Sequence, residues 1–301
     1  AFLQRVDAAL FEGETLHSRV PRSRNLEAQD LLLILLGFAV GTFGTLVGAG
    51  GGFILVPVLL FLYPDKDPET ITAISLFVVW ANATSGSIAY ARHRRIDYRS
   101  GLWFAVATLP GAVAGAILVG FIPRRTFDGM FATVLVVLGL VLLLRSASNA
   151  IQPPVSGWST VQRTLTDSHG NTYRYSFQMW KGVAISTVVG FVSSLLGIGG
   201  GVIHVPVMAT VLHFPVHIAA ATSHFVLAFM ALEGTGVHFL TGALEFDRSL
   251  VQAVMLALGA IPGAQAGAYL SRHVHDSHII RALAVGLVLV GVRLAFKAIQ
   301  G

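Results

Sequence analysis

The chain has 301 residues, of which 12% are charged and 54% are hydrophobic, and its mean hydropathy is +0.72. Soluble proteins carry about 25% charged residues, so the composition excludes an ordinary soluble protein and indicates an integral membrane protein. The absence of cysteine excludes disulfides and thiolate metal sites. The net charge of +5 fits Lys and Arg in cytoplasmic loops, and we expect no nucleic-acid binding and no cofactor.

Residues 1–30 carry nine charges and no apolar core, so they do not form a signal peptide. Apolar residues in this extension follow roughly helical spacing, which is typical of a short amphipathic surface helix; a disordered tail is the alternative. These apolar residues are Phe2, Leu3, Val6, Leu10 and Phe11.

Ten apolar segments follow, separated by charged or polar joints. They span about 31–49, 52–63, 70–91, 101–122, 128–146, 180–198, 202–213, 217–241, 249–271 and 278–299. Most suffice for a membrane-spanning helix, which needs about 20 apolar residues. The second and seventh have only about 12 residues, so we expect half-helices or re-entrant arms. The fold class is therefore an all-α integral membrane protein.

Two glycine-rich runs, 48–52 and 197–201, interrupt long charge-free stretches. Consecutive glycines disfavour a helix, so we expect a break at each run and a new helix after it. The glycines around 110–116 and 262–268 are better explained by close helix packing.

Residues 147–179 form a polar linker between the apolar halves. Pro153 and Pro154 indicate an extended connection, and 161–175 alternate around a turn at 168–171. The pattern predicts a small, solvent-exposed β-hairpin.

The glycine runs belong to an internal duplication. Gly41, Gly48 and Pro57 recur 149 residues later as Gly190, Gly197 and Pro206. The stretch 110–116 recurs 152 residues later at 262–268. The chain thus divides into a transmembrane repeat at 31–146, the linker at 147–179 and a second repeat at 180–301, giving two homologous five-segment halves.

The loop charges orient the first half. Arg92, Arg94, Arg95 and Arg99 lie on the side of the hairpin, which makes that side cytoplasmic, and Lys66 lies opposite, with Arg124 and Arg125. If the short segments are re-entrant, the halves are inverted; if each broken pair is one kinked span, the halves are parallel. We favour inverted repeats, because the broken helices then face each other.

The motifs resemble a known family. Gly44-Thr-Leu-Val-Gly-Ala-Gly-Gly-Gly-Phe-Ile-Leu-Val-Pro57 is similar to the first signature of the TauE/SafE (sulfite exporter) family. Ser193-Ser-Leu-Leu-Gly-Ile-Gly-Gly-Gly-Val-Ile-His-Val-Pro206, followed by Ala220-Ala-Thr-Ser223, is similar to the second. The resemblance covers about 31–299. It implies a multi-pass inner-membrane exporter of sulfite, sulfoacetate or other small sulfur-containing anions.

Interrupted segments at matching positions of two repeats favour a substrate site where they meet. Helix N-termini with bare amides attract anions, and nearby hydroxyls, amides and imidazoles add hydrogen-bond donors. The candidate binding residues are Gly50, Gly51, Gly52, Ser75, Asn82, Gly199, Gly200, Gly201, His204, Thr222, Ser223 and His224. Structural hydrogen bonds are the alternative role for Asn82 and the two histidines. Helix capping is the alternative for Thr222 and Ser223, and close helix packing is the alternative for the glycines.

Glu233 is the only charged residue inside its segment's apolar core, and an intramembrane carboxylate indicates function. It is a candidate for proton or cation coupling, together with His238. The alternative is a neutral Glu233 bonded to His238 or Gln265.

Three classes of function remain after these observations. A secondary transporter that rocks one half against the other is favoured. An anion channel with the same site, and a non-transporting sensor or scaffold, are the alternatives. No hydrolase or metalloprotease motif occurs, so we expect no enzyme. A homodimer fits such carriers, although no particular residue indicates it.

Overall fold

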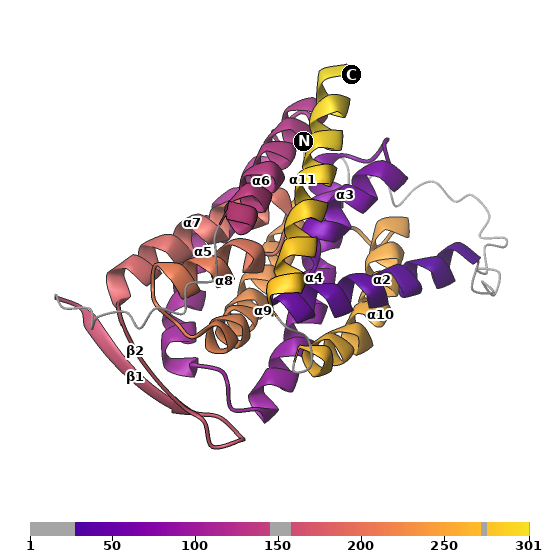
Figure 1. Ribbon diagram of the computed structural model, residues 1–301. Coiled ribbons are helices and arrows are strands. Elements are labelled where there is room, and N and C mark those ends of the chain that lie inside the picture. Colours follow the sequence, from indigo (N-terminus) through magenta and orange to yellow (C-terminus); the bar gives the residue numbers. More distant parts are fainter. Residues whose placement is uncertain (1–27, 145–157, 272–275, 301) are drawn as a thin grey trace, which may run out of the picture.

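The computed structural model describes residues 28–144, 158–271 and 276–300 (Figure 1). The first half contains α2 (Ala28–Val47), α3 (Gly52–Leu62), α4 (Pro68–Arg92), α5 (Tyr98–Val119) and α6 (Arg124–Leu144). The second half contains α7 (Met179–Leu196), α8 (Gly201–Thr210), α9 (Val216–Thr241), α10 (Arg248–Leu270) and α11 (Asp276–Gln300). The predicted surface helix in the N-terminal extension and the diproline linker lie outside the described residues.

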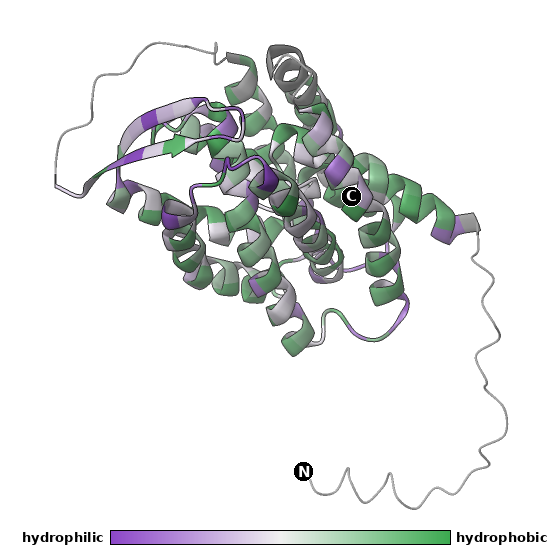
Figure 2. Ribbon diagram, turned by 90° about the horizontal axis from the view of Figure 1, so that it is seen from below, coloured by the Kyte–Doolittle hydropathy of each residue, from purple (hydrophilic) through white to green (hydrophobic). Residues whose placement is uncertain are grey.

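The helical membrane fold predicted from the sequence is confirmed. In the described part of the chain, α2, α4, α5, α7, α9 and α10 are long and apolar enough to cross a membrane. The helices α3 and α8 are apolar but have only 11 and 10 residues. Figure 2 shows hydrophobic residues along the helices and hydrophilic residues on the hairpin and at helix ends.

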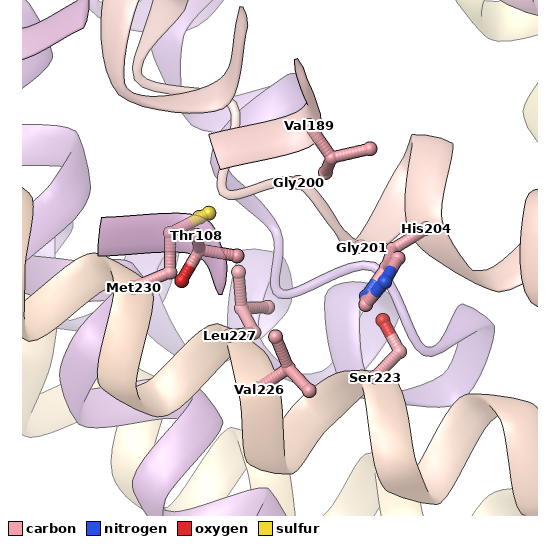
Figure 3. A pocket seen from close by; sticks show the side chains of 9 residues that line it. All are labelled: Thr108, Val189, Gly200, Gly201, His204, Ser223, Val226, Leu227 and Met230. Atoms are coloured by element: carbon pink, nitrogen blue, oxygen red, sulfur yellow. The ribbon is translucent and has the colours of Figure 1, made fainter. Parts of the chain in front are cut away.

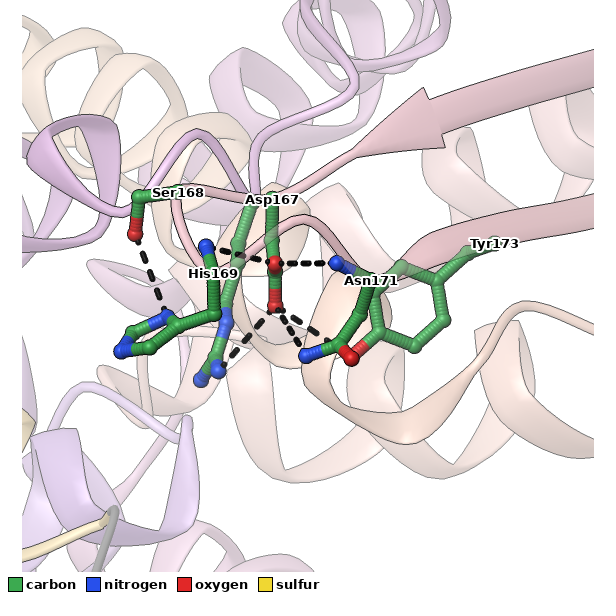
Figure 4. A network of polar contacts seen from close by, with 6 residues as sticks. Asp167, Ser168, His169, Asn171 and Tyr173 are labelled. Carbon is green, nitrogen blue, oxygen red and sulfur yellow. Dashed lines mark hydrogen bonds and ion pairs between the residues drawn. The ribbon is translucent and has the colours of Figure 1, made fainter.

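The predicted hairpin is confirmed. Strand β1 (Thr160–Thr166) pairs antiparallel with β2 (Thr172–Gln178), with Thr166 opposite Thr172 next to the turn. The Asp167 carboxylate organises that turn, because it accepts hydrogen bonds from the backbone amides of His169 and Asn171 (Figure 4). Arg95, in the loop between α4 and α5, lies 3.5 Å from the same carboxylate.

The expectation that the hairpin is fully solvent-exposed is wrong for its inner face. Tyr175 and Phe177 are buried against Phe104 and Phe214. Asp97 fixes this face, since its carboxylate accepts a hydrogen bond from the Tyr175 hydroxyl at 2.8 Å. The alternating strand pattern showed one apolar face, but not the aromatic pocket beneath it.

The Asp167 contacts predict how the hairpin responds to mutation and acid. Burial raises the pKa of Asp167, but hydrogen bonds from Asn171 and His169 and the charge of Arg95 outweigh it and lower the pKa from 3.8 to about 2. The ionised carboxylate therefore stabilises the docked hairpin above pH 3.8, and this stabilisation is lost as the pH falls toward about 2.

We expect Asp167→Asn to remove this stabilisation at neutral pH and to speed amide hydrogen exchange across 160–178 severalfold. Mass spectrometry of labelled peptides measures the exchange. Asp65→Asn, in an exposed loop elsewhere, is the matched control and should leave exchange in the hairpin unchanged. Equal exchange in both variants would contradict the role of Asp167.

Glycines allow two pairs of helices to pack with their backbones in contact. α2 packs along α10, with Gly259 against the backbone of Ile34 and Gly263 against Phe38, so residue numbers rise together and the helices are parallel. The same parallel contact joins α5 to α7. Small residues allow such backbone approach within membranes. The packing role expected for the glycines of 110–116 and 262–268 is confirmed.

Two pairs of helices at matching positions of the two halves, α4 with α9 and α6 with α11, are in contact, and the helices of each pair run in opposite directions. The start of α4 meets the end of α9, where Thr241 donates a hydrogen bond to Glu69. The end of α4 meets the start of α9, where the Tyr90 ring packs on His224. The helices α6 and α11 lie side by side in Figure 1 and also pack antiparallel.

Candidate functional site

The backbone turns sharply at both glycine runs. Between α2 and α3 the φ angles of Gly48, Gly50 and Gly51 are 79°, 77° and 85°. Between α7 and α8 the equivalent residues Gly197, Gly199 and Gly200 have φ angles of 67°, 74° and 55°. Residues with a Cβ rarely adopt this left-handed region, so glycine is required at these positions. We call 48–51 the first glycine turn and 197–200 the second.

The two glycine turns cross at close range. A Cβ on Gly52, the first residue of α3, would lie 2.5 Å from the carbonyl oxygen of Gly197. A Cβ on Gly201, the first residue of α8, would lie 2.6 Å from the carbonyl oxygen of Gly48. The start of each short helix therefore contacts the opposite glycine turn, and both lie in the interior.

Several amides at this crossing have no acceptor. In the described residues, no hydrogen bond is donated by the backbone amides of Gly51, Gly52 and Phe53, or by those of Gly199, Gly200 and Val202. All six residues are buried. Buried amides are nearly always paired, so this concentration of free donors indicates a place for an acceptor.

A narrow pocket lies beside the second glycine turn (Figure 3). Gly200, Gly201, His204, Ser223 and Thr108 contribute to its wall, and apolar side chains complete it. Ser223 is buried, and its hydroxyl has no hydrogen-bond partner. His204 is held from α7, where the Ser186 hydroxyl lies 3.2 Å from Nε2. The pocket thus brings together four of the predicted binding residues.

A second polar cluster supports the first glycine turn. The Asn82 amide donates to the carbonyl of Gly50 at 3.2 Å, and its oxygen accepts from the Thr45 hydroxyl at 3.3 Å. His224 Nε2 lies 3.3 Å from the same hydroxyl, and Tyr90 donates to the carbonyl of Thr45. Asn82 and His224 are therefore engaged in interhelical contacts in this conformation.

The remaining predicted binding residues lie at other places. Ser75 donates to the carbonyl of Gly197 at 2.7 Å, so it braces the second glycine turn from α4. Thr222 accepts from the amide of Asp97 at 3.0 Å, which places it at the loop before α5 and away from the glycine turns.

The candidate coupling residues are separate from each other. Glu233 lies beside Thr108 and is half-buried, and one of its carboxylate oxygens has no partner. His238 is fully buried and lies 3.9 Å from Glu69. The suggested bond from Glu233 to Gln265 is wrong, because Gln265 donates to the carbonyl and hydroxyl of Ser85.

Sequence reasoning missed three contributors. Thr45 links Asn82 to His224, and its place inside the first glycine signature was the available signal. Thr108 lines the pocket from α5, two residues before Pro110. Glu69 stands in a charged joint, where nothing in the local sequence distinguishes it from its neighbours.

The two polar clusters predict unequal losses of stability on mutation. Asn82→Ala leaves the buried Gly50 carbonyl without its side-chain partner and removes one of the two partners of the Thr45 hydroxyl, so we expect a loss of about 1 kcal/mol or more. Ser223→Ala removes a hydroxyl that has no partner, so the expected loss is small. Thermal unfolding in detergent measures both, with Thr133→Ala on the exposed face of α6 as control. Equal losses from Asn82→Ala and Ser223→Ala would contradict this difference in pairing.

Comparison with known proteins identifies the family. A family model described as "Sulfite exporter TauE/SafE" matches residues 33–294, from α2 into α11. The chain belongs to the TauE/SafE family. As a TauE/SafE protein it is a membrane transporter, and the resemblance read from the two glycine signatures is confirmed.

Curated relatives agree with this TauE/SafE assignment. The "Probable membrane transporter protein YunE" of Bacillus subtilis is 32% identical over 89% of this chain and 98% of its own length. The "Probable membrane transporter protein MJ0441" of Methanocaldococcus jannaschii is 25% identical over 87% of this chain and 93% of its own length. No solved structure matches the chain.

Proposed function

We propose that this TauE/SafE protein is a secondary carrier that exports a small sulfur-containing anion, such as sulfite, sulfoacetate or a related sulfonate. The anion would bind where the two glycine turns cross. The observation that carries this proposal is the set of buried backbone amides without acceptors at the starts of α3 and α8. Helix N-termini of this kind stabilise negative charge.

The donors at this site are neutral. Among the residues that line the pocket there is no Lys or Arg, whereas a hydroxyl and an imidazole stand beside the glycines. A site of amides and hydroxyls binds an oxyanion without trapping it by full charge pairing, which suits a carrier that must release its substrate. Ser223 and His204 are the side chains that we assign to substrate contact, and Asn82 and Ser75 position the turns.

We infer that the two halves are inverted repeats, with α3 and α8 as re-entrant arms. The antiparallel packing of the equivalent helices α4 and α9 supports this relation, because parallel repeats would make them parallel. The helices α3 and α8 have only 11 and 10 residues, too few to cross a bilayer, which supports their role as re-entrant arms. The site would then lie near the bilayer midplane.

Carrier action is favoured over a channel by the closed state of the site. The pocket beside Ser223 is too narrow to admit a water molecule in this conformation. An open anion channel needs a continuous path, whereas a carrier passes through occluded states while one half rocks against the other. The expected inner-membrane location, with the hairpin in the cytoplasm, and the homodimer stay predictions.

Flux measurements test the proposal. Proteoliposomes that contain the purified protein should accumulate ³⁵S-sulfite at a saturable rate, with the solutions kept above neutral pH so that sulfite stays ionised. We expect Ser223→Ala to reduce flux about tenfold or more, since it removes a donor aimed into the pocket. Thr133→Ala should transport normally. Protein-dependent flux that does not saturate would favour the channel, and normal flux through Ser223→Ala would refute the site.

A further inference from the structure

The two halves differ in how their buried polar side chains are paired. In the first half, Thr45, Ser75 and Tyr90 each have a hydrogen-bond partner. Their equivalents in the second half, 148 or 149 residues later, are Ser194, Ser223 and His238. None of these three side chains is hydrogen-bonded in the described part of the chain, although all are buried.

The unpaired groups of the second half continue from the glycine turns toward the start of α4. Ser193 stands against Gly200, because a Cβ on that glycine would lie 2.7 Å from its hydroxyl. Ser194 stands against Gly234, one helical turn before His238 on α9. Thr235 of α9 is buried and unpaired as well, and so is Thr72 of α4 in the first half, which contacts Gly197.

Glu69 lies at the solvent-accessible end of this row of unpaired groups. Its carboxylate lies 3.9 Å from His238 Nδ1 and has a side-chain exposure of 27%, against 0% for His238. It stands three residues before Thr72, on the same face of α4. Among the described residues, Glu69 of α4 is the acidic group that lies within 4.0 Å of the His238 ring nitrogens.

We propose that Glu69 and His238 form the proton entrance of the carrier, and that the unpaired hydroxyls behind them lead protons toward the substrate site. The hydroxyls are Thr72, Ser193, Ser194 and Thr235. This inference rests on the proposed carrier function. The pocket beside the second glycine turn admits no water in this conformation, so the path conducts when the carrier opens and ordered water joins the unpaired hydroxyls.

Proton passage fits this path better than anion passage. A carboxylate at the mouth repels an anion but binds a proton from the outer solution. The proton then passes to the imidazole of His238, which is within 3.9 Å and can accept it on either nitrogen. No atom other than the proton changes place, so the step needs no further reactant.

The experiment separates coupling from substrate binding. Proteoliposomes with ³⁵S-sulfite are assayed in two ways, by sulfite–sulfite exchange at equal pH and by accumulation driven by an imposed pH gradient. We expect Glu69→Gln and His238→Gln to keep exchange near the wild-type rate and to lose gradient-driven accumulation by about tenfold or more. Glu245→Gln, an exposed acid in the loop between α9 and α10, is the control and should retain both activities.

Three other results would contradict either the proton entrance or the carrier function. Gradient-driven accumulation retained in both variants would overturn the proton entrance while leaving the carrier intact. Loss of both activities in protein with unchanged thermal stability would also overturn it, since the path would then serve the anion. Absence of exchange in the wild type would refute the carrier function itself.

Discussion

Replacing Gly259 by alanine should destabilise the protein by about 2 to 3 kcal/mol, because the added methyl group has no space. Gly259 of α10 lies against the backbone of Ile34 and Phe38 on α2, and its missing Cβ lets the two helices touch. A Cβ there would overlap the carbonyl oxygen of Ile34. Backbone cannot rotate aside as a side chain can, so the helices must separate along their length.

A matched glycine gives the opposite expectation. A Cβ on Gly236 of α9 would have nothing within 4 Å, so Gly236→Ala should leave the packing intact and raise stability by up to about 1 kcal/mol through helix propensity. Thermal unfolding of both variants in the same detergent provides the comparison. If Gly259→Ala were as stable as Gly236→Ala, close packing of α2 on α10 could not be a determinant of the fold.

Replacing Gly51 by alanine should abolish transport, with a loss of about a hundredfold or more. Gly51 has a φ of 85°, and a Cβ would lie 2.8 Å from the side chain of Val40. To relieve this contact the first glycine turn must shift, which moves the free amides of Gly51 and Gly52. An anion held by backbone donors depends on their positions, so binding and flux should both fail.

A control variant at Gly242 separates the loss of the binding site from the effect of backbone strain. It has a φ of 80° at the end of α9, where a Cβ would meet only Glu245 at 3.5 Å. Alanine costs about 1 kcal/mol in this conformation at either position. We expect Gly242→Ala to transport at the wild-type rate and Gly51→Ala to be inactive. Equal flux through both variants would mean that the first glycine turn has no part in binding.

Much of the helical plan could be predicted from the sequence because the membrane imposes long apolar segments. The segment expected at 249–271 is the helix Arg248–Leu270, and the hairpin follows its alternating strands. The breaks at the glycine runs could be predicted because consecutive glycines disfavour a helix. These features are local, so a single sequence reveals them.

The pairing of polar side chains could not be predicted, because it depends on which helices meet. Asn82 and Ser223 both looked like ligand contacts, yet Asn82 is bonded to Gly50 and Thr45 whereas Ser223 is free. Thr222 lies next to Ser223 in sequence but points to the opposite side, toward Asp97. Glu69 acquires interest only because α4 and α9 are antiparallel, which brings it to His238.

The free amides themselves can be observed. The chain contains four Gly–Gly peptide bonds, which supply the free amides of Gly51, Gly52 and Gly200 and the amide of Gly201, which donates to the Gly199 carbonyl. Protein labelled with ¹³C-carbonyl glycine and ¹⁵N-glycine therefore gives carbonyl-correlated amide NMR signals from the two glycine turns alone. We expect saturable chemical-shift changes in these signals on titration with sulfite, and their loss in Ser223→Ala. Signals that stay unchanged at saturating sulfite, in protein that transports it, would contradict binding at the glycine turns.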